Sequence, residues 1–257
     1  MNSTTPANRI ALVTGASRGI GRSTALSLAA RGVDVIITYL SAEAEAARVV
    51  KQIEALGRRA VALRLDVGAT ATFAEFSRTV QATLRTTWQR ERLDYLVNNA
   101  GAGVYATFAE TSEQDFDLMV NTHLKGTFFL TQKMLPLIED GGRILNTSSG
   151  LTRFTFSGYA AYAAAKAGVE VLTRFMAKEL GARRISVNVI APGGTETDFG
   201  GGALRDNAEL NTQFAGMTAL GRNGLPDDIG GVVAALLDGN AGWITGQRIE
   251  ASGGALL

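Results

Sequence analysis

The sequence predicts an α/β fold: a single Rossmann-type domain whose doubly wound, seven-stranded parallel sheet carries helices on both faces. Three observations lead to this expectation. Short runs rich in branched apolar residues alternate with longer segments of helical period, the pattern of repeated β-α units. The strand-like runs are apolar on both faces, as parallel strands covered by helices must be. The 257 residues, 46% of them apolar, are enough for one large core, and no linker, repeat or low-complexity segment divides residues 1–257.

The expected elements alternate along the chain from residue 10 onward. A strand at 10–14 leads directly into a helix at 19–31, and a second strand at 33–39 precedes an alanine- and glutamate-rich helix at 42–56. Further short apolar runs continue the series of strands at 60–65, 95–98, 143–147, 186–191 and 247–250. Ligands of such a sheet bind outside the carboxyl ends of its strands.

Two later segments need separate treatment. Ser112, three residues before Asp115, resembles a capping box that opens a helix through Leu118 to Leu135. Residues 193–226 are glycine-rich and weakly periodic. This segment is either a mobile lid over the substrate or an ordinary surface loop with a short helix.

The composition excludes several classes of function. With 25 basic and 24 acidic side chains and no block of like charges, the chain has no electrostatic footprint for nucleic acid or a membrane surface. Zero cysteines and one histidine exclude a disulfide framework, a thiolate nucleophile, cysteine-ligated metals and a multi-histidine site, so no metal is expected. No apolar run approaches the ~18 residues of a membrane span, and residues 1–8 lack the apolar stretch of a signal peptide. We therefore expect a soluble cytoplasmic protein.

A glycine-rich turn follows the first strand and opens the first helix, with the sequence Thr14-Gly15-Ala16-Ser17-Arg18-Gly19-Ile20-Gly21. Gly15 permits the tight turn, Gly19 lets the backbone approach a pyrophosphate, and Gly21 lets the helix lie close to the sheet. The N–H groups and the positive dipole end of the helix then face the phosphates. The turn, with Ser17 and Ile20 between the glycines, predicts a dinucleotide site.

The end of the second strand favours NADP(H) over NAD. An acidic residue about 20 positions beyond the glycines would bind the ribose hydroxyls of NAD. Here that stretch is Thr38-Tyr39-Leu40-Ser41, which contains no carboxylate to repel a 2′-phosphate. Arg18 can pair with that phosphate, and the Ser41 hydroxyl can hydrogen-bond it.

Further motifs follow in order: Asp66-Val67, Asn98-Asn99-Ala100-Gly101, Ser148-Ser149, Tyr162-Ala163-Ala164-Ala165-Lys166, Asn188, Pro192-Gly193 with Thr197-Asp198, and Ile244-Thr245-Gly246 through Gly253-Gly254. With these motifs the chain closely resembles, over nearly its whole length, the classical short-chain dehydrogenase/reductase family, and within it the NADP-dependent 3-oxoacyl-carrier-protein reductase-like members. The resemblance implies cofactor contacts at Asp66, Val67, Asn98, Ala100, Gly101, Tyr162, Lys166, Pro192, Gly193 and Thr197.

The chemistry of carbonyl reduction explains the spacing of Tyr162 and Lys166. The reaction needs a hydride from the nicotinamide and a proton for the oxygen. At i and i+4 the two side chains share one helix face. The ammonium is expected to lower the phenol's pKa, ordinarily near 10, and to make Tyr162 a general acid/base. By resemblance, Lys166 also hydrogen-bonds the nicotinamide ribose, and Ser149 orients and stabilises the substrate oxygen.

Each of these residues alone has a plainer interpretation as a packing tyrosine, a solvated lysine or a strand-end hydroxyl. Their joint occurrence after a dinucleotide-type turn favours catalysis. Tyr159 and Ser148 are the competing assignments, but Ala163 stands where Tyr159 would need a lysine. The alternative function is a non-catalytic NADP(H)-binding sensor or scaffold, and the intact Ser, Tyr and Lys set argues against it.

The single histidine departs from the family pattern. An Asn on the helix after the fourth strand usually holds a water that feeds protons to the lysine, and the matching position here is His123 rather than Asn121. Imidazole both donates and accepts, so His123 can hold the same water. With a pKa near 6.5 it can also become charged and lower the pKa of Lys166. The plainer interpretation is a histidine that fills a polar gap between helices.

The substrate is expected to be a small apolar carbonyl compound: a 3-oxoacyl thioester, a ketone or an aldehyde. By resemblance, residues 150–157 and 195–217 line its pocket, and they contain Phe154, Phe156, Phe199 and Phe214. Arg183 matches an arginine that docks an acidic carrier protein, whereas Asp140 stands near the position of another. The resemblance also implies a homotetramer built on the helices at 116–135 and 162–180.

Overall fold

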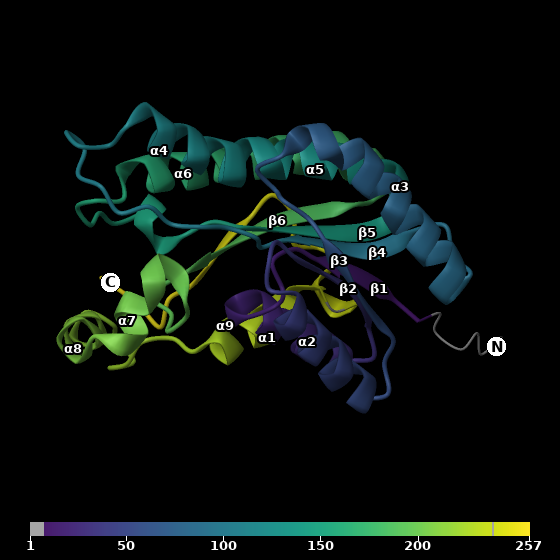
Figure 1. Ribbon diagram of the computed structural model, residues 1–257, viewed down its shortest axis with the longest axis horizontal. Helices are drawn as coiled ribbons and strands as arrows, with labels where there is room; N and C mark the ends of the chain where they lie inside the picture. The colour runs from purple at the N-terminus through teal and green to yellow at the C-terminus, as the bar shows by residue number, and fades with distance from the viewer. Residues whose placement is uncertain (1–7, 238) are drawn as a thin grey trace.

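The computed structural model describes residues 8–237 and 239–257, and within them seven parallel strands form one sheet (Figure 1). The strand order is β3-β2-β1-β4-β5-β6-β7. The second and third strands are added outwards on one side of β1, and the remaining four are added outwards on its other side, starting with β4. This confirms the predicted fold class. The strands are β1 (Ile10–Val13), β2 (Asp34–Tyr39), β3 (Ala60–Arg64), β4 (Leu93–Asn98), β5 (Ile138–Thr147), β6 (Ser186–Pro192) and β7 (Arg248–Ala251).

Helices cover both faces of the sheet (Figure 1). One face carries α1 (Gly19–Ala30), α2 (Glu43–Ala55) and α9 (Pro226–Leu237), and the other carries α3 (Phe73–Thr83), α4 (Glu113–Met119), α5 (Gly126–Met134) and α6 (Ala160–Leu180). Two short helices, α7 (Ala203–Asp206) and α8 (Ala208–Gly216), lie beyond one end of the sheet. Short 3-10 turns are found at Thr70–Thr72, Leu135–Leu137, Gly150–Thr152, Gly181–Arg183, Phe199–Gly202 and Gly239–Ala241, and a π-helical turn at Leu84–Trp88.

The core consists of two layers, one on each side of the sheet, because successive strand residues point to opposite faces. In β1, Ala11 and Val13 join the layer under α1, α2 and α9, whereas Ile10 and Leu12 join the layer under α3 and α5. All four side chains are fully buried. Both faces of the strand are therefore apolar.

The predicted capping box is present, and the helix that it opens is not uniform. The Ser112 hydroxyl accepts a hydrogen bond from the Asp115 N–H at 3.1 Å. Between α4 and α5 the backbone makes a π-helical turn at Val120–Lys125 before α-helical geometry resumes. Such turns within α-helices are frequent at functional sites.

Helix α9 holds α1 in close contact and thereby fixes the turn that precedes α1. An ideal Cβ on Gly230 would lie 2.3 Å from Ser23 Oγ and 2.6 Å from the Ser23 carbonyl carbon. The Ser23 hydroxyl donates to Asp227 Oδ1 at 2.6 Å. Neither α9 nor α3 is among the helices expected from the sequence. Within the described residues, no helix is both long enough and apolar enough to cross a membrane.

Candidate active site

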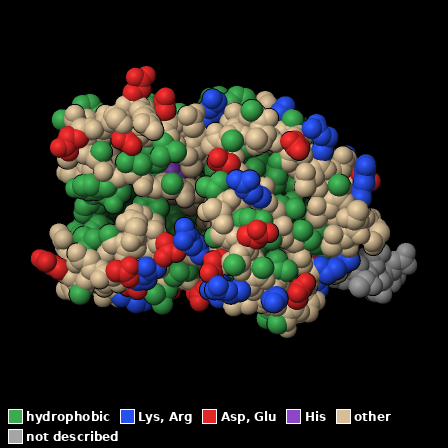
Figure 2. All heavy atoms as spheres, in the orientation of Figure 1, with side chains coloured by type: hydrophobic (Ala, Val, Ile, Leu, Met, Phe, Trp, Pro, Cys, Tyr) green, Lys and Arg blue, Asp and Glu red, His purple; other side chains and the backbone are tan. Residues whose placement is uncertain are grey.

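A cavity of about 750 Å³ opens at the carboxyl ends of the strands. Figure 2 shows the hollow on the surface of the molecule, with hydrophobic side chains gathered along it. Eighteen of the nineteen expected site residues line the cavity: Gly15, Ser17, Arg18, Gly19, Ile20, Gly21, Ser41, Asp66, Val67, Ala100, Gly101, His123, Ser149, Tyr162, Lys166, Pro192, Gly193 and Thr197. The topology therefore brings motifs from the whole chain to one place.

Asn98 is the exception, because it does not line the cavity. Its side chain is buried between the sheet and α5, where it donates to Thr131 Oγ1 of α5 at 2.9 Å and to Asn146 Oδ1 of β5 at 2.8 Å. The neighbouring Asn99 lies at the cavity instead, where its Nδ2 donates to the carbonyls of Thr14 and Gly15. The expected cofactor contact at Asn98 is thus corrected to a sheet contact.

The glycine turn has the backbone that its sequence requires. Gly15 and Gly19 have φ values of +63° and +55°, in the left-handed region that favours glycine. An ideal Cβ on Gly21 would lie 2.3 Å from the Gly15 carbonyl oxygen, so only glycine fits there. Thr14 Oγ1 accepts hydrogen bonds from the N–H groups of Asn99 and Ala100, which ties the turn to the end of β4. The turn and the N-terminus of α1 fit a dinucleotide phosphate.

Where the cavity meets the end of β2, its lining includes Arg18 and contains no carboxylate from β2. Arg18, whose side chain is 66% exposed, pairs with Asp198 at 3.4 Å. Ser41 lines the cavity, and Arg64 Nε donates to the Leu40 carbonyl at 3.2 Å. Sequence reasoning missed Arg64, because its position beside residues 39–41 depends on the pairing of β3 with β2.

Tyr162 and Lys166 occupy one buried face of α6, as their spacing predicts. The Ser149 side chain lies within hydrogen-bonding reach of the Tyr162 hydroxyl and acts to lower its pKa. Lys166 Nζ donates to the Thr147 carbonyl at 2.6 Å and lies 5.7 Å from the centre of the Tyr162 ring. Three groups able to hold or move a proton therefore meet at the end of β5.

Burial shifts the pKa of Tyr162 upwards, whereas the sequence predicted a downward shift. It raises the pKa of Tyr162 to about 12, although the hydrogen bond from Ser149 opposes the rise. Burial also lowers the pKa of Lys166 to about 7. The expected lowering of the Tyr162 pKa by a lysine ammonium is not found in this geometry, because burial is the largest influence on Tyr162 and also disfavours the charged form of Lys166.

His123 lies in the π-helical turn, with its ring packed edge-on against Tyr162 at a centroid distance of 5.0 Å. His123 Nε2 is 2.7 Å from the Ala102 carbonyl, so it carries the proton of the neutral ring. Nδ1 is buried and has no hydrogen-bond partner among the described residues. An ideal Cβ on Gly101 would lie 2.7 Å from His123 Cε1, so the ring fits only beside a glycine. Asn121 does not line the cavity.

The pKa of His123 is lowered to about 3, first by burial and then by the charge of Lys166. A histidine with this pKa stays neutral in the physiological range. The expectation that His123 becomes charged near neutrality is therefore wrong. Its unpaired Nδ1 leaves an acceptor, and this acceptor is the feature that a relay water needs.

Ser148 and Tyr159, the alternatives to Ser149 and Tyr162 as catalytic residues, make different contacts. The Ser148 hydroxyl points away from Tyr162 and donates to Glu170 Oε1 at 2.6 Å. Tyr159 lines the cavity, 6.4 Å from the Tyr162 ring, and burial raises its pKa. Neither residue has the contacts that Ser149 and Tyr162 make with each other.

Aromatic side chains form the wall of the cavity opposite the glycine turn. Phe156 packs against Phe154 and Phe214, at ring-centroid distances of 5.7 and 4.8 Å. Phe199 lies 5.3 Å from the Tyr162 ring. All four phenylalanines singled out in the sequence line the cavity. This wall is suited to an apolar substrate.

Residues 193–226 lie over the cavity and contain α7 and α8. Phe199 occupies the space beside Gly103, where an ideal Cβ would lie 2.5 Å from its ring. Gly200, Gly201 and Gly202 follow with φ values of +61°, +72° and +81°. The segment is attached at its base by a β-bridge between Thr195 and Gly224. Its side chains Phe199 and Phe214 line the cavity.

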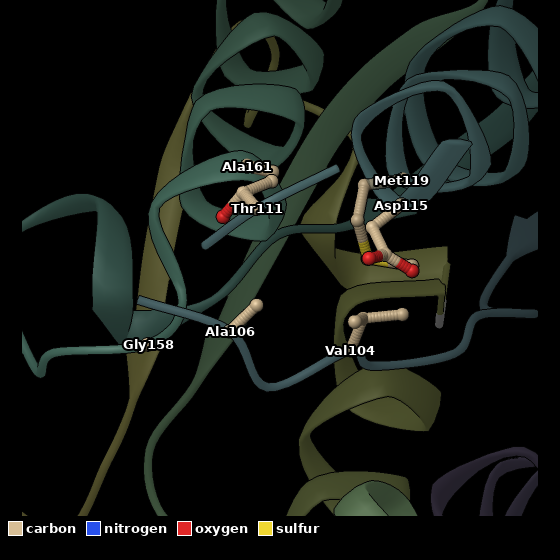
Figure 3. A pocket seen from close by; sticks show the side chains of 7 residues that line it. All are labelled: Val104, Ala106, Thr111, Asp115, Met119, Gly158 and Ala161. Atoms are coloured by element: carbon tan, nitrogen blue, oxygen red, sulfur yellow. The ribbon is translucent and has the colours of Figure 1, made fainter. Parts of the chain in front are cut away.

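A second, smaller cavity lies between the loop before α4 and the start of α6 (Figure 3). Its volume of about 10 Å³ is the size of one water molecule. Figure 3 shows the side chains of Val104, Asp115 and Met119 directed towards it. It has no room for a substrate.

Arg183 lies away from the cavity and is fully engaged. Its Nε pairs with Asp140 Oδ1 at 2.7 Å, and Nη1 donates to the Leu135 carbonyl at 2.9 Å. The residue precedes β6, so it stands at the amino ends of the strands. The arginine that the resemblance implies for docking is thus paired with the same Asp140 within the chain.

Comparison with known proteins agrees with this geometry. The family model described as enoyl-(acyl carrier protein) reductase matches residues 15–255. The hydroxynaphthalene reductase-like protein Arp2 of Metarhizium brunneum is 38% identical, covering 97% of this chain and 96% of its own. The promiscuous reductase LugOII, which catalyses keto-reduction at C1 in lugdunomycin biosynthesis, superimposes with a TM-score of 0.92 at 38% identity, covering 98% and 99% of the two chains. The angucycline C-6 ketoreductase LanV with bound NADP has a TM-score of 0.92 at 37% identity, covering 96% and 95%.

Proposed function

This chain belongs to the short-chain dehydrogenase/reductase family, and on that premise we propose that it uses NADPH to reduce a ketone on an apolar, ring-containing substrate. One observation carries the proposal. The neighbouring Ser149 and Tyr162 hydroxyls lie in a single cavity that is lined by the glycine turn and by aromatic side chains. The cofactor and the substrate carbonyl thus have separate places beside one proton donor.

The residues of the cavity fit NADP(H). The N-terminus of α1 and the glycine turn suit the pyrophosphate, while Arg18 and Ser41 suit the 2′-phosphate. Arg64 lies beside them, where its Nε donates to the Leu40 carbonyl. Six further residues of the cavity would complete the cofactor site. At the adenosine end these are Asp66 and Val67, and at the nicotinamide end they are Lys166, Pro192, Gly193 and Thr197. When bound, NADPH supplies the hydride for the carbonyl carbon.

The protein's own part in the reaction is to protonate the carbonyl oxygen. Because the pKa of Tyr162 is about 12, its phenol is protonated at neutral pH, which is the form that a proton donor needs. The Ser149 hydroxyl stabilises the negative charge that develops on the same oxygen. Lys166, with a pKa of about 7, can both give and take a proton near neutrality and so restore the phenol.

His123 takes the place of the relay asparagine as a neutral acceptor. Its proton is committed to the Ala102 carbonyl, so Nδ1 is the atom that can hold a water. In this role His123 orients a proton path to Lys166 and does not itself titrate near neutrality.

The substrate is a ring ketone rather than a carrier-bound acyl chain. Phe154, Phe156 and Phe214 give the cavity an aromatic lining, which suits a planar ring. LugOII and LanV are named for keto-reduction, and the Metarhizium relative is named as hydroxynaphthalene reductase-like, which supports a ketone on an aromatic framework. A 3-oxoacyl thioester is the second candidate, favoured by the description of the family model. The engagement of Arg183 with Asp140 argues against a carrier protein.

The test is NADPH oxidation by purified protein with 1-tetralone (a ketone fused to a benzene ring) beside acetoacetyl-coenzyme A, with NADH as the cofactor control. We expect turnover of the ring ketone with NADPH. Tyr162→Phe should lower kcat by about 100-fold or more while NADPH binding, measured by cofactor fluorescence, is retained.

Tyr159→Phe is the matched control, since it removes a phenol from the same cavity without touching the proposed donor. It should retain most of the activity. Equal loss in both variants would contradict the assignment of Tyr162. NADPH binding with no turnover of any carbonyl compound would favour the sensor or scaffold alternative.

A further inference from the structure

Helix α6 carries a third polar side chain on the face that bears Tyr162 and Lys166. Glu170 follows Lys166 by four residues, so it lies one turn further along the same face. Its side chain is 14% exposed. The reaction proposed above gives it no part. A carboxylate that is mostly buried needs hydrogen-bond or ion-pair partners. The partners of Glu170 indicate its role.

Three donors converge on one oxygen of this carboxylate. Glu170 Oε1 is 2.6 Å from Ser148 Oγ, 2.6 Å from Thr152 Oγ1 and 2.8 Å from Arg248 Nε. Ser148 and Thr152 stand on either side of Ser149, the residue that caps the turn Gly150–Thr152. The two hydroxyls thus attach both sides of the Ser149 turn to the helix that carries Tyr162.

Arg248 reinforces this attachment from β7. Its Nη2 lies 3.2 Å from Thr152 Oγ1 and 3.4 Å from the Ser149 carbonyl. Its Nη1 pairs with Glu250 at 2.9 Å, and Glu250 pairs in turn with Arg153 at 2.8 Å. The Glu170 carboxylate is therefore compensated by a guanidinium, as a partly buried charge must be.

We propose that Glu170 is a positioning residue, which acts by holding Ser148 and Thr152 so that the Ser149 hydroxyl between them stays directed at Tyr162. The proposal rests on the proposed function, because it presumes that Ser149 binds the carbonyl oxygen. A hydroxyl that stabilises a transition state must be held to within about 0.5 Å, and such precision comes from surrounding hydrogen bonds. The turn itself supplies one of them, from the Leu151 N–H to Ser149 Oγ at 3.2 Å.

The test is a double-mutant cycle on NADPH-dependent reduction of 1-tetralone, with Glu170→Ala, Ser149→Ala and the double variant. Glu170→Ala is expected to lower kcat about tenfold, with the KM for ketone and the dissociation constant for NADPH changed by no more than about twofold. In the Ser149→Ala background the same substitution should change kcat by less than about twofold, because the group through which it acts is gone. Glu179→Ala, at an exposed glutamate of the same helix, is the matched control and should leave kcat unchanged.

The outcomes separate this proposal from the function on which it rests. An equal loss of kcat in both backgrounds, or no loss at all from Glu170→Ala, would overturn the positioning role. If Ser149→Ala itself leaves kcat unchanged, the proposed function fails. In that case crystal structures of the parent protein and of Glu170→Ala decide the present proposal. An unchanged position of the Ser149 hydroxyl beside Tyr162 would overturn it, and a displaced Ser149 hydroxyl would support it.

Two further variants keep the proposal testable if Glu170→Ala does not fold. Glu170→Gln retains an acceptor oxygen at the same place and should restore most of kcat. Thr152→Val keeps the shape of the side chain and removes one of the two attached hydroxyls. It should lower kcat by a smaller factor, again only where Ser149 is present, and an effect independent of Ser149 would overturn the proposal.

Discussion

Desolvation determines the protonation states of Tyr162, Lys166 and His123, the three buried titratable groups described at the site. It raises the pKa of Tyr162 and lowers those of Lys166 and His123, and in each case it is the largest cause. At neutral pH the phenol is therefore protonated and the imidazole neutral, while Lys166 is divided between its two forms. The proposed mechanism uses this combination, since Tyr162 as donor holds its proton and Lys166 can replace it.

His123→Asn should leave the enzyme active and its pH profile between about pH 5 and 8 unchanged, because a histidine with a pKa of about 3 does not titrate there. The measurement is kcat against pH for both proteins. A shift of an inflection within that range would show that His123 titrates near neutrality and would sink the neutral-acceptor role.

The same substitution has a signature in stability. The unfolded chain protonates His123 near pH 6.5, whereas the folded chain does so only at about 3, so the unfolded state binds more protons between these values. The contribution of His123 to the free energy of unfolding is therefore lost progressively as the pH falls from about 6.5 to about 3. The asparagine variant lacks that contribution, so urea denaturation at pH 7 and pH 4 should show a smaller loss than in the parent protein.

Residue identities at the site were predictable, and several of their contacts were not. Tyr162 and Lys166 follow from helical spacing, and the glycine turn follows from its place between a strand and a helix. The direction of Lys166 Nζ towards the Thr147 carbonyl depends on the register of α6 against β5, which no local pattern encodes. Asn98 was misplaced for a similar reason, because strand alternation turns it into the sheet while Asn99 reaches the cavity.

At the scale of elements, the packing of α9 on α1 controls the position of the cofactor turn. Gly230→Ala would place a Cβ against Ser23 backbone and side-chain atoms at 2.3–2.8 Å. We expect this variant to lose about 1–3 kcal/mol of stability and to bind NADPH more weakly, since α1 must shift. Urea denaturation followed through the fluorescence of the buried Trp88 provides the measurement.

Gly231→Ala is the matched control in the same helix. An added Cβ there meets nothing within 4 Å, so the substitution should stabilise the helix by up to about 1 kcal/mol and leave NADPH affinity unchanged. The packing argument fails if the two variants lose stability equally.

The glycines at 230 and 231 also explain why α9 was not expected from the sequence. Adjacent glycines in a helix interior are unfavourable for an isolated helix, and the contact with α1 outweighs that preference. The π-helical turn was equally hidden, because Val120–Lys125 continues the helical period on either side of it. The alternation of strands and helices, in contrast, is a pattern of whole segments and predicted all seven strands.

At the scale of the whole molecule, large apolar side chains remain exposed along one helical face. Phe116, Phe128, Phe129, Val171 and Phe175 on α4, α5 and α6 are 38–63% exposed. Soluble chains rarely leave such a patch uncovered. These are the helices on which the sequence resemblance places a subunit interface, so a homotetramer, or a homodimer through this face, is the expected assembly.

Phe175→Glu places a charge at the most exposed of these positions and should reduce the assembly to smaller species, measured by light scattering after gel filtration. Phe108→Glu is the control, because Phe108 is 88% exposed but lies in the loop before α4. A single unchanged mass for the parent protein and both variants would exclude this face as the interface.

The contact between Gly101 and His123 constrains how this enzyme can evolve. The imidazole is fixed by Ala102 on one side and by Tyr162 on another, so it has no space into which to retreat from a Cβ added at position 101. A mutation that enlarges residue 101 is tolerated only after residue 123 has become smaller. The two positions are therefore epistatic, and a lineage that keeps its activity must accept their substitutions in one order.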